Sequence, residues 1–233
     1  MADLYGDWAE LAAAEVDGVD YRIRSTDPAG ASLASIAIHG GGIEAGSGEM
    51  AREVAGTWLR YYELDGMKSS GNGDLHITST NYDEPRALAL VATARGCLSF
   101  HGYQDDDRLL STTAIGGRDT ALAARAAGEL RVAGFTVTAA TGDIAGTNPA
   151  NICNRTLSGS GVQLEMSQAL RRSFFPGGDL TRPSRESGAR TEAFFRYAAA
   201  LRSACTVPAP APAADRSELI PPTRPRAGSG RPC

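Results

Sequence analysis

The sequence has no long apolar run and almost no excess of charge of one sign. No window approaches the roughly 20 apolar residues that a membrane-spanning helix needs. The 23 Lys and Arg residues nearly balance the 27 Asp and Glu residues, which leaves a formal net charge of −4. Such a balance gives no general electrostatic attraction to nucleic acid or to anionic membranes. We therefore expect neither nucleic acid nor a membrane as a partner.

Cysteine is also scarce, and its spacing argues against a disulfide framework. The four cysteines lack CxxC spacing and lie in unlike contexts, at Cys97, Cys153, Cys205 and Cys233. The N-terminal residues 1–15 are acidic and contain neither the basic n-region nor the apolar h-region of a secretory signal. These features predict a cytoplasmic protein made in a reducing cytosol, which would act outside the cell only after release by lysis.

Strand-like and helix-like patterns alternate along most of the chain. Alternating or short apolar runs predict strands at Ser35–Ile38, Leu75–Thr78, Cys97–Phe100, Leu109–Ala114, Phe135–Thr138 and Val162–Glu165. Helical periodicity falls between them, at Glu49–Leu59, Pro85–Ala94, Thr120–Ala133 and Thr191–Ser203. The alternation predicts an α/β fold, a single three-layer domain with a mixed, mainly parallel sheet flanked by helices. Active sites in such sheets lie at the carboxyl ends of the strands.

The last part of the chain differs in composition from the rest. Residues 206–233 are rich in Pro, Ala and Arg and include the run Pro-Ala-Pro-Ala-Pro at 208–212. Such a composition cannot build an apolar core and is typical of disorder. We predict a folded domain over residues 1–205, a disordered tail over 206–233, and a monomer.

Only three histidines occur, and each lies at or inside a strand-like segment: His39, His76 and His101. For any one of them alone, a hydrogen-bonded structural histidine is the commoner interpretation, because structural and ligand histidines both need a fixed tautomer. The residues around two of them favour a site. The role of His76 cannot be assigned from the sequence.

The surroundings of His39 and His101 predict a metal site. Three glycines and Ile43 separate His39 from Glu44, so a compact turn can bring the carboxylate back toward the imidazole. A second strand ends at His101 and can add another imidazole alongside. Two histidines and one glutamate form the ligand set of many catalytic zinc sites, which keep one position open. We predict His39, Glu44 and His101 as the ligands of one zinc ion per chain.

The glycines allow other interpretations, since glycine turns also form loops or surround phosphates. Residues 46–51, Gly-Ser-Gly-Glu-Met-Ala, fit the GxGxxA pattern of dinucleotide sites, and Glu63 or Asp65 lies near the distance expected for a ribose-binding acid. The motif follows its strand by about six residues rather than immediately, which disfavours a dinucleotide site.

Glu165 interrupts an apolar strand, and a carboxylate in such a place is costly unless it is paired or functional. An ion pair with Arg171 or Arg172 would explain it structurally. Beside a metal site, however, a partly desolvated glutamate is suited to take a proton from water. We predict Glu165 as the catalytic base.

A loop rich in amide side chains precedes this strand, at residues 148–155. Asparagines alone indicate only turns. Arg155 beside Asn154 adds a planar guanidinium that can hold a substrate carboxylate, although an arginine in an ordinary surface ion pair is commoner. Tyr103 and Arg171 are further candidates for substrate contact.

Taken in order, these motifs resemble the poly-γ-glutamate hydrolase family of bacteriophages and bacterial genomes. The resemblance runs from about residue 17 to about residue 202 and rests on the segments His39–Glu44, His76–Ser79, Tyr82–Pro85, Ser99–Tyr103, Asn151–Arg155 and Val162–Glu165. It implies a zinc hydrolase domain with a sheet related to that of the zinc carboxypeptidases. It also implies a polyanionic substrate, poly-γ-glutamate or a related γ-glutamyl polymer.

Carried over by motif, the resemblance makes His39, Glu44 and His101 the zinc ligands and Glu165 the base, with Asn154 and Arg155 as a carboxylate-binding pair. Two other functions remain open. One is a zinc deacylase of small N-acyl amino acids, which would use the same metal and base. The other is a non-catalytic protein that binds a carboxylate polymer and whose histidines are structural.

Overall fold

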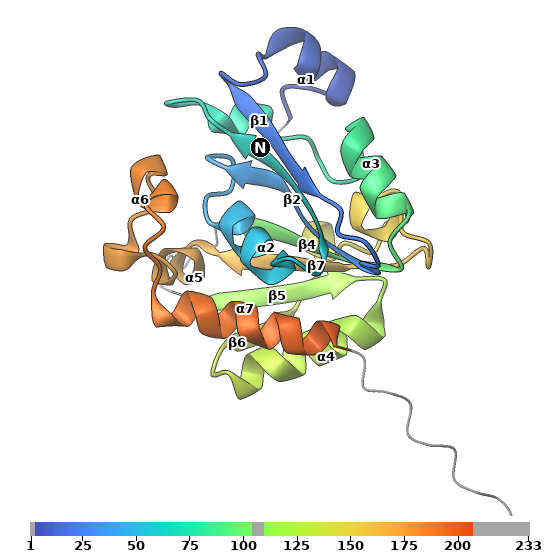
Figure 1. Cartoon of the computed structure of the whole chain (residues 1–233), viewed down its shortest axis with the longest axis vertical. Coiled ribbons are helices and arrows are strands. Elements are labelled where there is room, and N and C mark those ends of the chain that lie inside the picture. The colour runs from blue at the N-terminus through green and yellow to red at the C-terminus, as the bar shows by residue number, and fades with distance from the viewer. Residues whose placement is uncertain (1–2, 104–109, 207–233) are drawn as a thin grey trace, which may run out of the picture.

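Seven segments of the chain pair into one mixed sheet (Figure 1). The structure is a computed structural model that describes residues 3–103 and 110–206. The strands are β1 (Tyr21–Thr26), β2 (Leu33–Gly41), β3 (Arg60–Gly66), β4 (Gly96–Tyr103), β5 (Thr112–Gly117), β6 (Thr136–Ala139) and β7 (Val162–Ser167). Their order in the sheet is β1-β3-β2-β4-β7-β5-β6. The run β3-β2-β4-β7 is parallel, β5 and β6 are parallel to each other, and β1 and β5 are antiparallel to β3 and β7.

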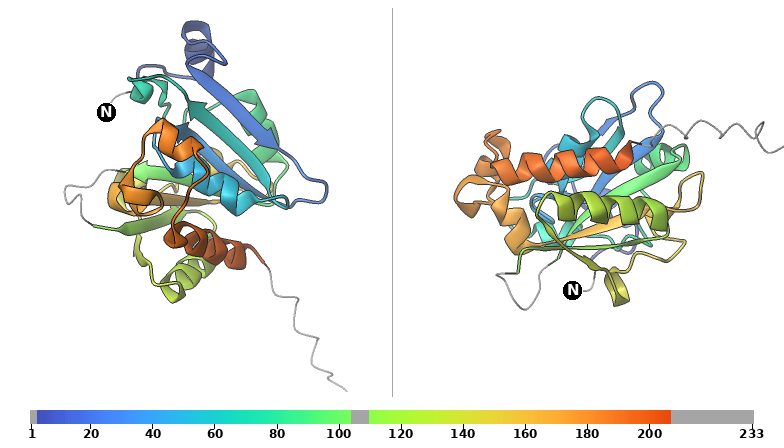
Figure 2. Two further views of the ribbon diagram at one scale, coloured as in Figure 1. Left: turned by 60° about the vertical axis from the view of Figure 1, so that its left-hand side comes forward. Right: turned by 90° about the horizontal axis from the view of Figure 1, so that it is seen from below.

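Helices cover both faces of the sheet and divide the apolar core into two clusters. One face packs against α2 (Ser47–Ala55), α4 (Thr120–Val132), α5 (Gln168–Ser173) and α7 (Glu192–Cys205). Figure 2 shows α4 and α7 lying side by side across this face. The other face packs against α1 (Trp8–Ala14), α3 (Pro85–Ala92) and the 3-10 turn η3 (Ile152–Asn154). The predicted fold class, a three-layer α/β domain with a mixed, mainly parallel sheet, is confirmed.

Short helices complete the connections: η1 (Asn72–Leu75), η2 (Gly142–Ile144), η4 (Pro176–Gly178) and α6 (Arg182–Glu186). The longer helices begin where the sequence places capping residues. Asp119 accepts a hydrogen bond from the Leu122 amide at the start of α4, and Thr191 accepts one from Phe194 at the start of α7. All four predicted helices are present as α2, α3, α4 and α7, and their ends differ from the predicted ends by a few residues at most.

The predicted strand at Leu75–Thr78 is wrong. Leu75 ends a 3-10 turn, His76 is extended, and residues 76–78 pair with no described strand. Leu75 and Ile77 are both fully buried, so the apolar pattern marked burial rather than strand pairing. Backbone groups of this segment instead hydrogen-bond to side chains: Thr78 N–H donates to Asp3, and the Ile77 carbonyl lies against His39.

Strands β1 and β3 were not predicted, because charged residues mask the apolar pattern of β3. Glu63 and Asp65 are buried in it, with 2% and 8% of their surfaces exposed. Arg22 and Arg24 on the neighbouring strand β1 both donate to Asp65, and the Tyr61 hydroxyl donates to Glu63. Because both carboxylates are engaged, neither is available as a ribose ligand.

The glycines of residues 46–51 serve close packing rather than phosphate binding. Gly46 precedes α2, and a Cβ at Gly48 would lie 1.8 Å from Glu63 Oε1, so α2 can approach β3 only with glycine at this position. The dinucleotide interpretation finds no support in this arrangement.

Among the described residues, three cysteines, Cys97, Cys153 and Cys205, are buried and free. No helix within residues 3–103 and 110–206 is long and apolar enough to cross a membrane. The start of the predicted strand Leu109–Ala114 and most of the predicted tail lie outside the described residues. The tail and its boundary at residue 205 therefore stay predictions.

The buried carboxyl of Glu63 makes stability depend on pH. Burial, together with Glu49 and Asp65, raises its pKa from an ordinary 4.5 to about 7. The folded state thus holds this proton more tightly than the unfolded state, so its contribution to stability is complete below about pH 4.5 and is lost as the pH rises through about 7. We expect the free energy of unfolding of the wild type to fall by up to about 3 kcal/mol relative to Glu63→Gln between pH 4.5 and 8.

Denaturant unfolding at a series of pH values measures this difference. Glu129→Gln, on the exposed face of α4, is the matched control and should keep the pH dependence of the wild type. If the free energies of unfolding of the wild type and Glu63→Gln changed equally with pH, the raised pKa of Glu63 would be contradicted.

Candidate metal centre

The turn after β2 brings a carboxylate back to the strand that it follows. His39 lies near the carboxyl end of β2 and is 2% exposed. Its carbonyl accepts hydrogen bonds from the Glu44 amide, at 2.9 Å, and from the Ser47 hydroxyl, at 3.1 Å. Gly41 has a φ of +63°, and a Cβ there would lie 2.3 Å from Asp65 Oδ1, so the turn requires glycine.

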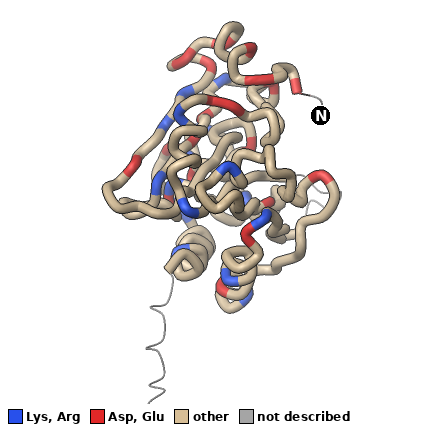
Figure 3. Tube along the Cα trace, turned by 90° about the vertical axis from the view of Figure 1, so that its right-hand side faces the viewer, with Lys and Arg blue, Asp and Glu red and all other residues tan. Residues whose placement is uncertain are grey.

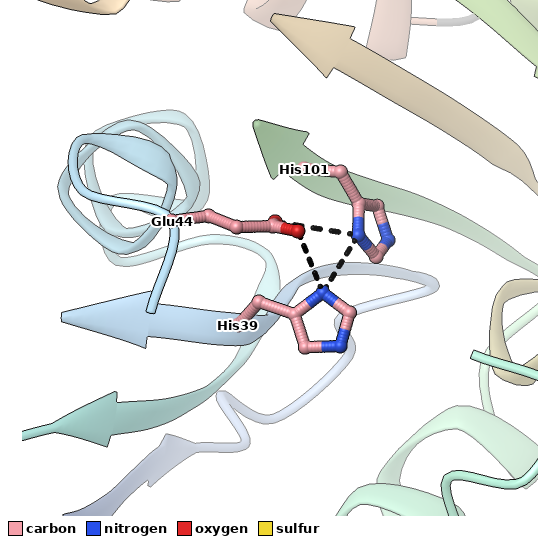
Figure 4. A group of neighbouring side chains, drawn as sticks. All are labelled: His39, Glu44 and His101. Carbon is pink, nitrogen blue, oxygen red and sulfur yellow. Dashed lines mark hydrogen bonds and ion pairs between the residues drawn. The ribbon is translucent and has the colours of Figure 1, made fainter. Parts of the chain in front are cut away.

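The neighbouring strand β4 supplies the second imidazole, and three ligand atoms face one another (Figure 4). The Nδ1 atoms of His39 and His101 are 3.1 Å apart. Glu44 Oε1 lies 3.1 Å from the first of them, and Glu44 Oε2 lies 3.6 Å from the second. The Gly102 amide donates to Glu44 Oε2 at 2.9 Å, which fixes the carboxylate in this place.

Hydrogen bonds on the far side of the rings decide which nitrogens face the centre as acceptors. His39 Nε2 lies 2.9 Å from the Ile77 carbonyl, which only accepts, so Nε2 carries the proton and Nδ1 of the neutral ring has a free lone pair. His101 Nε2 lies 2.8 Å from the Ser99 hydroxyl, which can accept its proton in the same way. Outer hydrogen bonds of this kind orient metal-binding histidines.

The donor set and its spacing fit a zinc ion. Two ring lone pairs and a carboxylate that converge without a proton between them repel one another unless a cation lies among them. Tetrahedral zinc with bonds of 2.0–2.1 Å to nitrogen and oxygen places neighbouring ligand atoms about 3.3 Å apart. The measured separations of 3.1 Å, 3.1 Å and 3.6 Å are close to this value. The residues present could therefore hold zinc with a position left for water or substrate.

Glu165 lies beside this group on the next strand, β7. It pairs in register with His101 across the parallel strands, so both side chains point to the same face of the sheet. Glu165 is 5% exposed, and its Oε1 accepts a hydrogen bond of 2.7 Å from Gln163. Among the described residues it forms no ion pair with Arg171 or Arg172, so the structural alternative for this carboxylate is not observed.

The close approach of these groups shifts their pKa values in different directions. Burial would raise the pKa of Glu44, but its close contacts with His39 and His101 outweigh burial and hold that pKa well below its usual range. Burial would lower the pKa of His101, but the neighbouring carboxylates of Glu44 and Glu165 raise it. Burial also raises the pKa of Glu165 itself, although His101 opposes the change. Glu44 is thus set to stay ionised, whereas Glu165 can hold a proton more readily.

A pocket of about 550 Å³ opens beside Glu44 and has cations on one side. Arg171 of α5 is 6% exposed and donates to the carbonyls of Met166, Ala45 and Tyr103. Its neighbour Arg172 is exposed and also lines the pocket. Asp3, from the N-terminal segment where acidic residues gather in Figure 3, also lines the pocket.

The remaining predicted substrate contacts are engaged within the protein. Asn154 is 2% exposed, donates to the carbonyls of Gly146 and Asn148, and accepts from the Gly161 amide. Arg155 donates to the carbonyls of Ala150 and Thr80. The Tyr103 hydroxyl pairs with Thr112. Contact of these three residues with substrate stays a prediction.

The structure also brings in residues that the sequence did not assign. His76 stacks on His39 with ring centroids 3.9 Å apart, and its Nδ1 lies 2.6 Å from Asp3 Oδ1. Burial, together with the neighbouring His39, lowers the pKa of His76. Gln163, two residues before Glu165 on the same face of β7, could have been found from strand alternation, whereas no local pattern distinguishes Asp3.

A mixed α/β sheet with two imidazoles, a carboxylate and a separate buried glutamate at its carboxyl edge is typical of metal-dependent hydrolases. The chain belongs to the poly-gamma-glutamate hydrolase family, whose sequence model matches residues 5–200, and it is therefore a hydrolase.

Individual relatives agree with this assignment. The UPF0714 protein YndL of Bacillus subtilis (strain 168) is 40% identical over 175 residues, which cover 74% of this chain and 67% of the relative. A solved bacteriophage poly-gamma-glutamate hydrolase is 38% identical with a TM-score of 0.83, over 87% of this chain and 96% of that one. The zinc-free apo structure of YndL is 36% identical with a TM-score of 0.79, over 87% and 97%.

We expect the two imidazoles to be necessary for metal binding. Zinc-loaded wild type should contain about one zinc per chain, whereas His39→Ala and His101→Ala should each contain less than about 0.2, since two ligands do not make a stable site. Elemental analysis after gel filtration measures this content. Glu165→Gln is the control and should keep its zinc; full occupancy in both histidine variants would refute the ligand assignment.

Proposed function

We propose that the protein hydrolyses γ-glutamyl amide bonds of poly-γ-glutamate, with zinc held by His39, Glu44 and His101 and with Glu165 as the general base. The observation that carries the proposal is the convergence of these three ligand atoms within 4.8 Å of one another, next to a buried glutamate, in a member of this family. When bound, zinc would polarise the scissile carbonyl and lower the pKa of water.

Glu165 is suited to move protons during the reaction. Its Oε1 is held by Gln163, which leaves Oε2 to accept a proton from the attacking water. Burial raises its pKa, so the protonated form can persist long enough to return the proton to the leaving amine nitrogen. Gln163 is itself fixed by Asn151, whose amide donates to Gln163 Oε1 at 2.7 Å. The base is therefore held by side chains that have few alternative positions.

Arg171 and Arg172 are suited to bind the free α-carboxylates of the polymer. The Arg171 guanidinium is fixed by three carbonyl groups and, among the described residues, has no carboxylate partner. A guanidinium without a carboxylate partner can form charge-assisted hydrogen bonds with a carboxylate that enters the pocket. Arg172, which is exposed beside it, would extend the positive surface along a chain of many carboxylates.

Two alternatives from the sequence differ in what they require. A deacylase of small N-acyl amino acids would use the same metal and base, so substrate length separates it from a polymer hydrolase. A non-catalytic binding protein would have structural histidines, each satisfied by its own local partner. The mutual approach of the His39 and His101 Nδ1 atoms, at 3.1 Å, favours a metal site over that arrangement.

We expect Glu165→Gln to keep its fold and its zinc but to lose at least about 100-fold in kcat on poly-γ-glutamate, because the amide preserves shape and cannot accept a proton. Product sizing with purified protein, before and after chelation and zinc return, measures the activity. A wild-type rate in Glu165→Gln would mean that another group is the base, and activity unaffected by chelation would exclude the metal mechanism.

We expect the wild type to cleave the γ-linked polymer internally and to act far less on the α-linked polymer. In a γ-linked chain each scissile amide has an α-carboxylate close by, which a fixed guanidinium can grip, whereas an α-linked chain carries its carboxylate at the end of a flexible side chain. Equal rates on the two polymers would favour the deacylase or another peptidase.

Two arginine variants test which cation holds that carboxylate. The sequence predicts that Arg155→Ala weakens kcat/KM by roughly 2–4 kcal/mol in transition-state stabilisation, and the pocket predicts a loss for Arg172→Ala of about 1–2 kcal/mol. Arg196→Ala, on the exposed side of α7, is the matched control and should change neither polymer's rate. An effect of Arg172→Ala on the γ-linked polymer alone would identify Arg172 as the contact.

A further inference from the structure

The peptide group between Ile77 and Thr78 joins a carboxylate to the candidate metal ligand His39. Its carbonyl oxygen lies 2.9 Å from His39 Nε2, and its N–H donates to Asp3 Oδ2 at 2.6 Å. The C=O and the N–H of a planar trans peptide group point in opposite directions, so one rigid unit can make both contacts. Asp3 therefore reaches the imidazole through a single peptide group.

The β-sheet does not hold this peptide group in place, because residues 76–78 pair with no described strand. The Ile77 side chain is fully buried, and the Ser79 carbonyl accepts a hydrogen bond of 2.9 Å from the Ile152 amide. These contacts hold the segment but leave the rotation of the Ile77–Thr78 peptide group free. Within residues 3–103 and 110–206, the Thr78 amide has no acceptor other than Asp3. Asp3 thus fixes the direction of the Ile77 carbonyl.

The two hydrogen bonds keep their direction whatever the charge of the imidazole. A carbonyl only accepts and a backbone N–H only donates, so His39 Nε2 carries a hydrogen in the neutral ring and in the charged ring alike. Hydrogen bonds in a chain polarise one another, so a carboxylate on the N–H makes the Ile77 carbonyl a stronger acceptor. A stronger acceptor at Nε2 makes the opposite nitrogen, Nδ1, a better metal ligand. That nitrogen is the one that lies 3.1 Å from Glu44 Oε1.

We propose that Asp3 is a positioning residue of the metal centre, which acts through the Ile77–Thr78 peptide group to orient His39 and to strengthen it as a zinc ligand. The proposal rests on the zinc ligands of the proposed function and does not depend on the substrate. Carboxylates commonly hydrogen-bond directly to metal-binding histidines. Here a peptide group lies between the two, and the carboxylate comes from 75 residues before Thr78 in the sequence.

Asp3 also has a second contact that an experiment must separate from the first. Its Oδ1 lies 2.6 Å from His76 Nδ1, and the His76 ring stacks on the His39 ring with centroids 3.9 Å apart. Removal of Asp3 could therefore act on His39 through the His76 ring. The substitution His76→Phe removes the contact with Asp3, keeps an aromatic ring against His39 and leaves the Thr78 amide unchanged.

The dissociation constant of zinc, measured on the full-length protein by competition with a chromophoric chelator, tests the proposal. We expect Asp3→Ala to bind zinc about 10-fold more weakly, at the low end of the effect of outer partners of metal ligands. Asp3→Asn keeps an oxygen that accepts from the Thr78 amide and should lose only about 2- to 3-fold, because a neutral acceptor is weaker than a charged one. Asp17→Ala removes the same charge from an exposed position and should bind zinc as the wild type does.

A double-mutant cycle decides which contact transmits the effect. Asp3→Ala should weaken zinc binding by about the same factor in a His76→Phe background as in the wild type. If the effect of Asp3→Ala disappears in that background, Asp3 acts through the His76 ring and the proposal is overturned. The thermal midpoint of the metal-free protein separates a purely structural role. A lower midpoint of Asp3→Ala together with unchanged zinc affinity would also overturn the proposal.

The outcome for the proposed function is read separately, from cleavage of poly-γ-glutamate. A wild type that cleaves the polymer and variants of Asp3 with unchanged zinc affinity would refute the role of Asp3 alone. A wild type that does not cleave the polymer but loses zinc affinity on Asp3→Ala would refute the proposed substrate and support the role of Asp3.

Discussion

The parallel pairing of β2, β4 and β7 is the constraint on which the candidate site depends. Parallel neighbours end at the same edge of the sheet, so His39, His101 and Glu165, which are far apart in the sequence, meet there. The in-register pairing of His101 with Glu165 sets the base beside the metal ligands on one face. A slip of one residue in β7 would turn Glu165 to the opposite face, which the helices α2, α4 and α7 cover with apolar side chains. The register is therefore fixed by the same packing that forms the core.

Burial of a charged side chain costs free energy unless polar groups contact it, and the charged groups at this edge have such contacts. Glu44 is surrounded by two imidazoles and an amide N–H, Glu165 is held by Gln163, and Arg171 is held by three carbonyls. A second buried ion pair joins α6 to α2, where Arg185 donates to Glu49 at 2.9 Å. These contacts leave few alternative positions for the groups that would touch substrate, which is the arrangement that preorganised sites require.

Local patterns were sufficient for most of the secondary structure. The cap at Asp119, the proline that begins α3 and the glycine turn after His39 act within a few residues, so the sequence alone locates these elements. The apolar pattern gave wrong predictions where buried residues do not lie in a strand, or where a strand contains buried charged residues. Leu75 and Ile77 are buried without being in a strand, and β3 is a central strand even though it carries Glu63 and Asp65, because arginines from β1 and a tyrosine hydroxyl lie within reach.

The sequence by itself determined the α/β class, the family and the identity of the convergent His39, Glu44 and His101, because the motif spacing and the strand ends imply a common edge. Only the tertiary structure decided the surroundings of that group. It placed His76, Asp3 and Arg171 in the wall of the pocket, and it showed that the side chains of Asn154 and Arg155 donate to backbone carbonyls. The physical reason is distance along the chain. Local backbone geometry positions residues that lie in one turn, such as His39 and Glu44. Contacts across 70 or more residues, such as Asp3 with His76, depend on how the packed layers bring distant segments together.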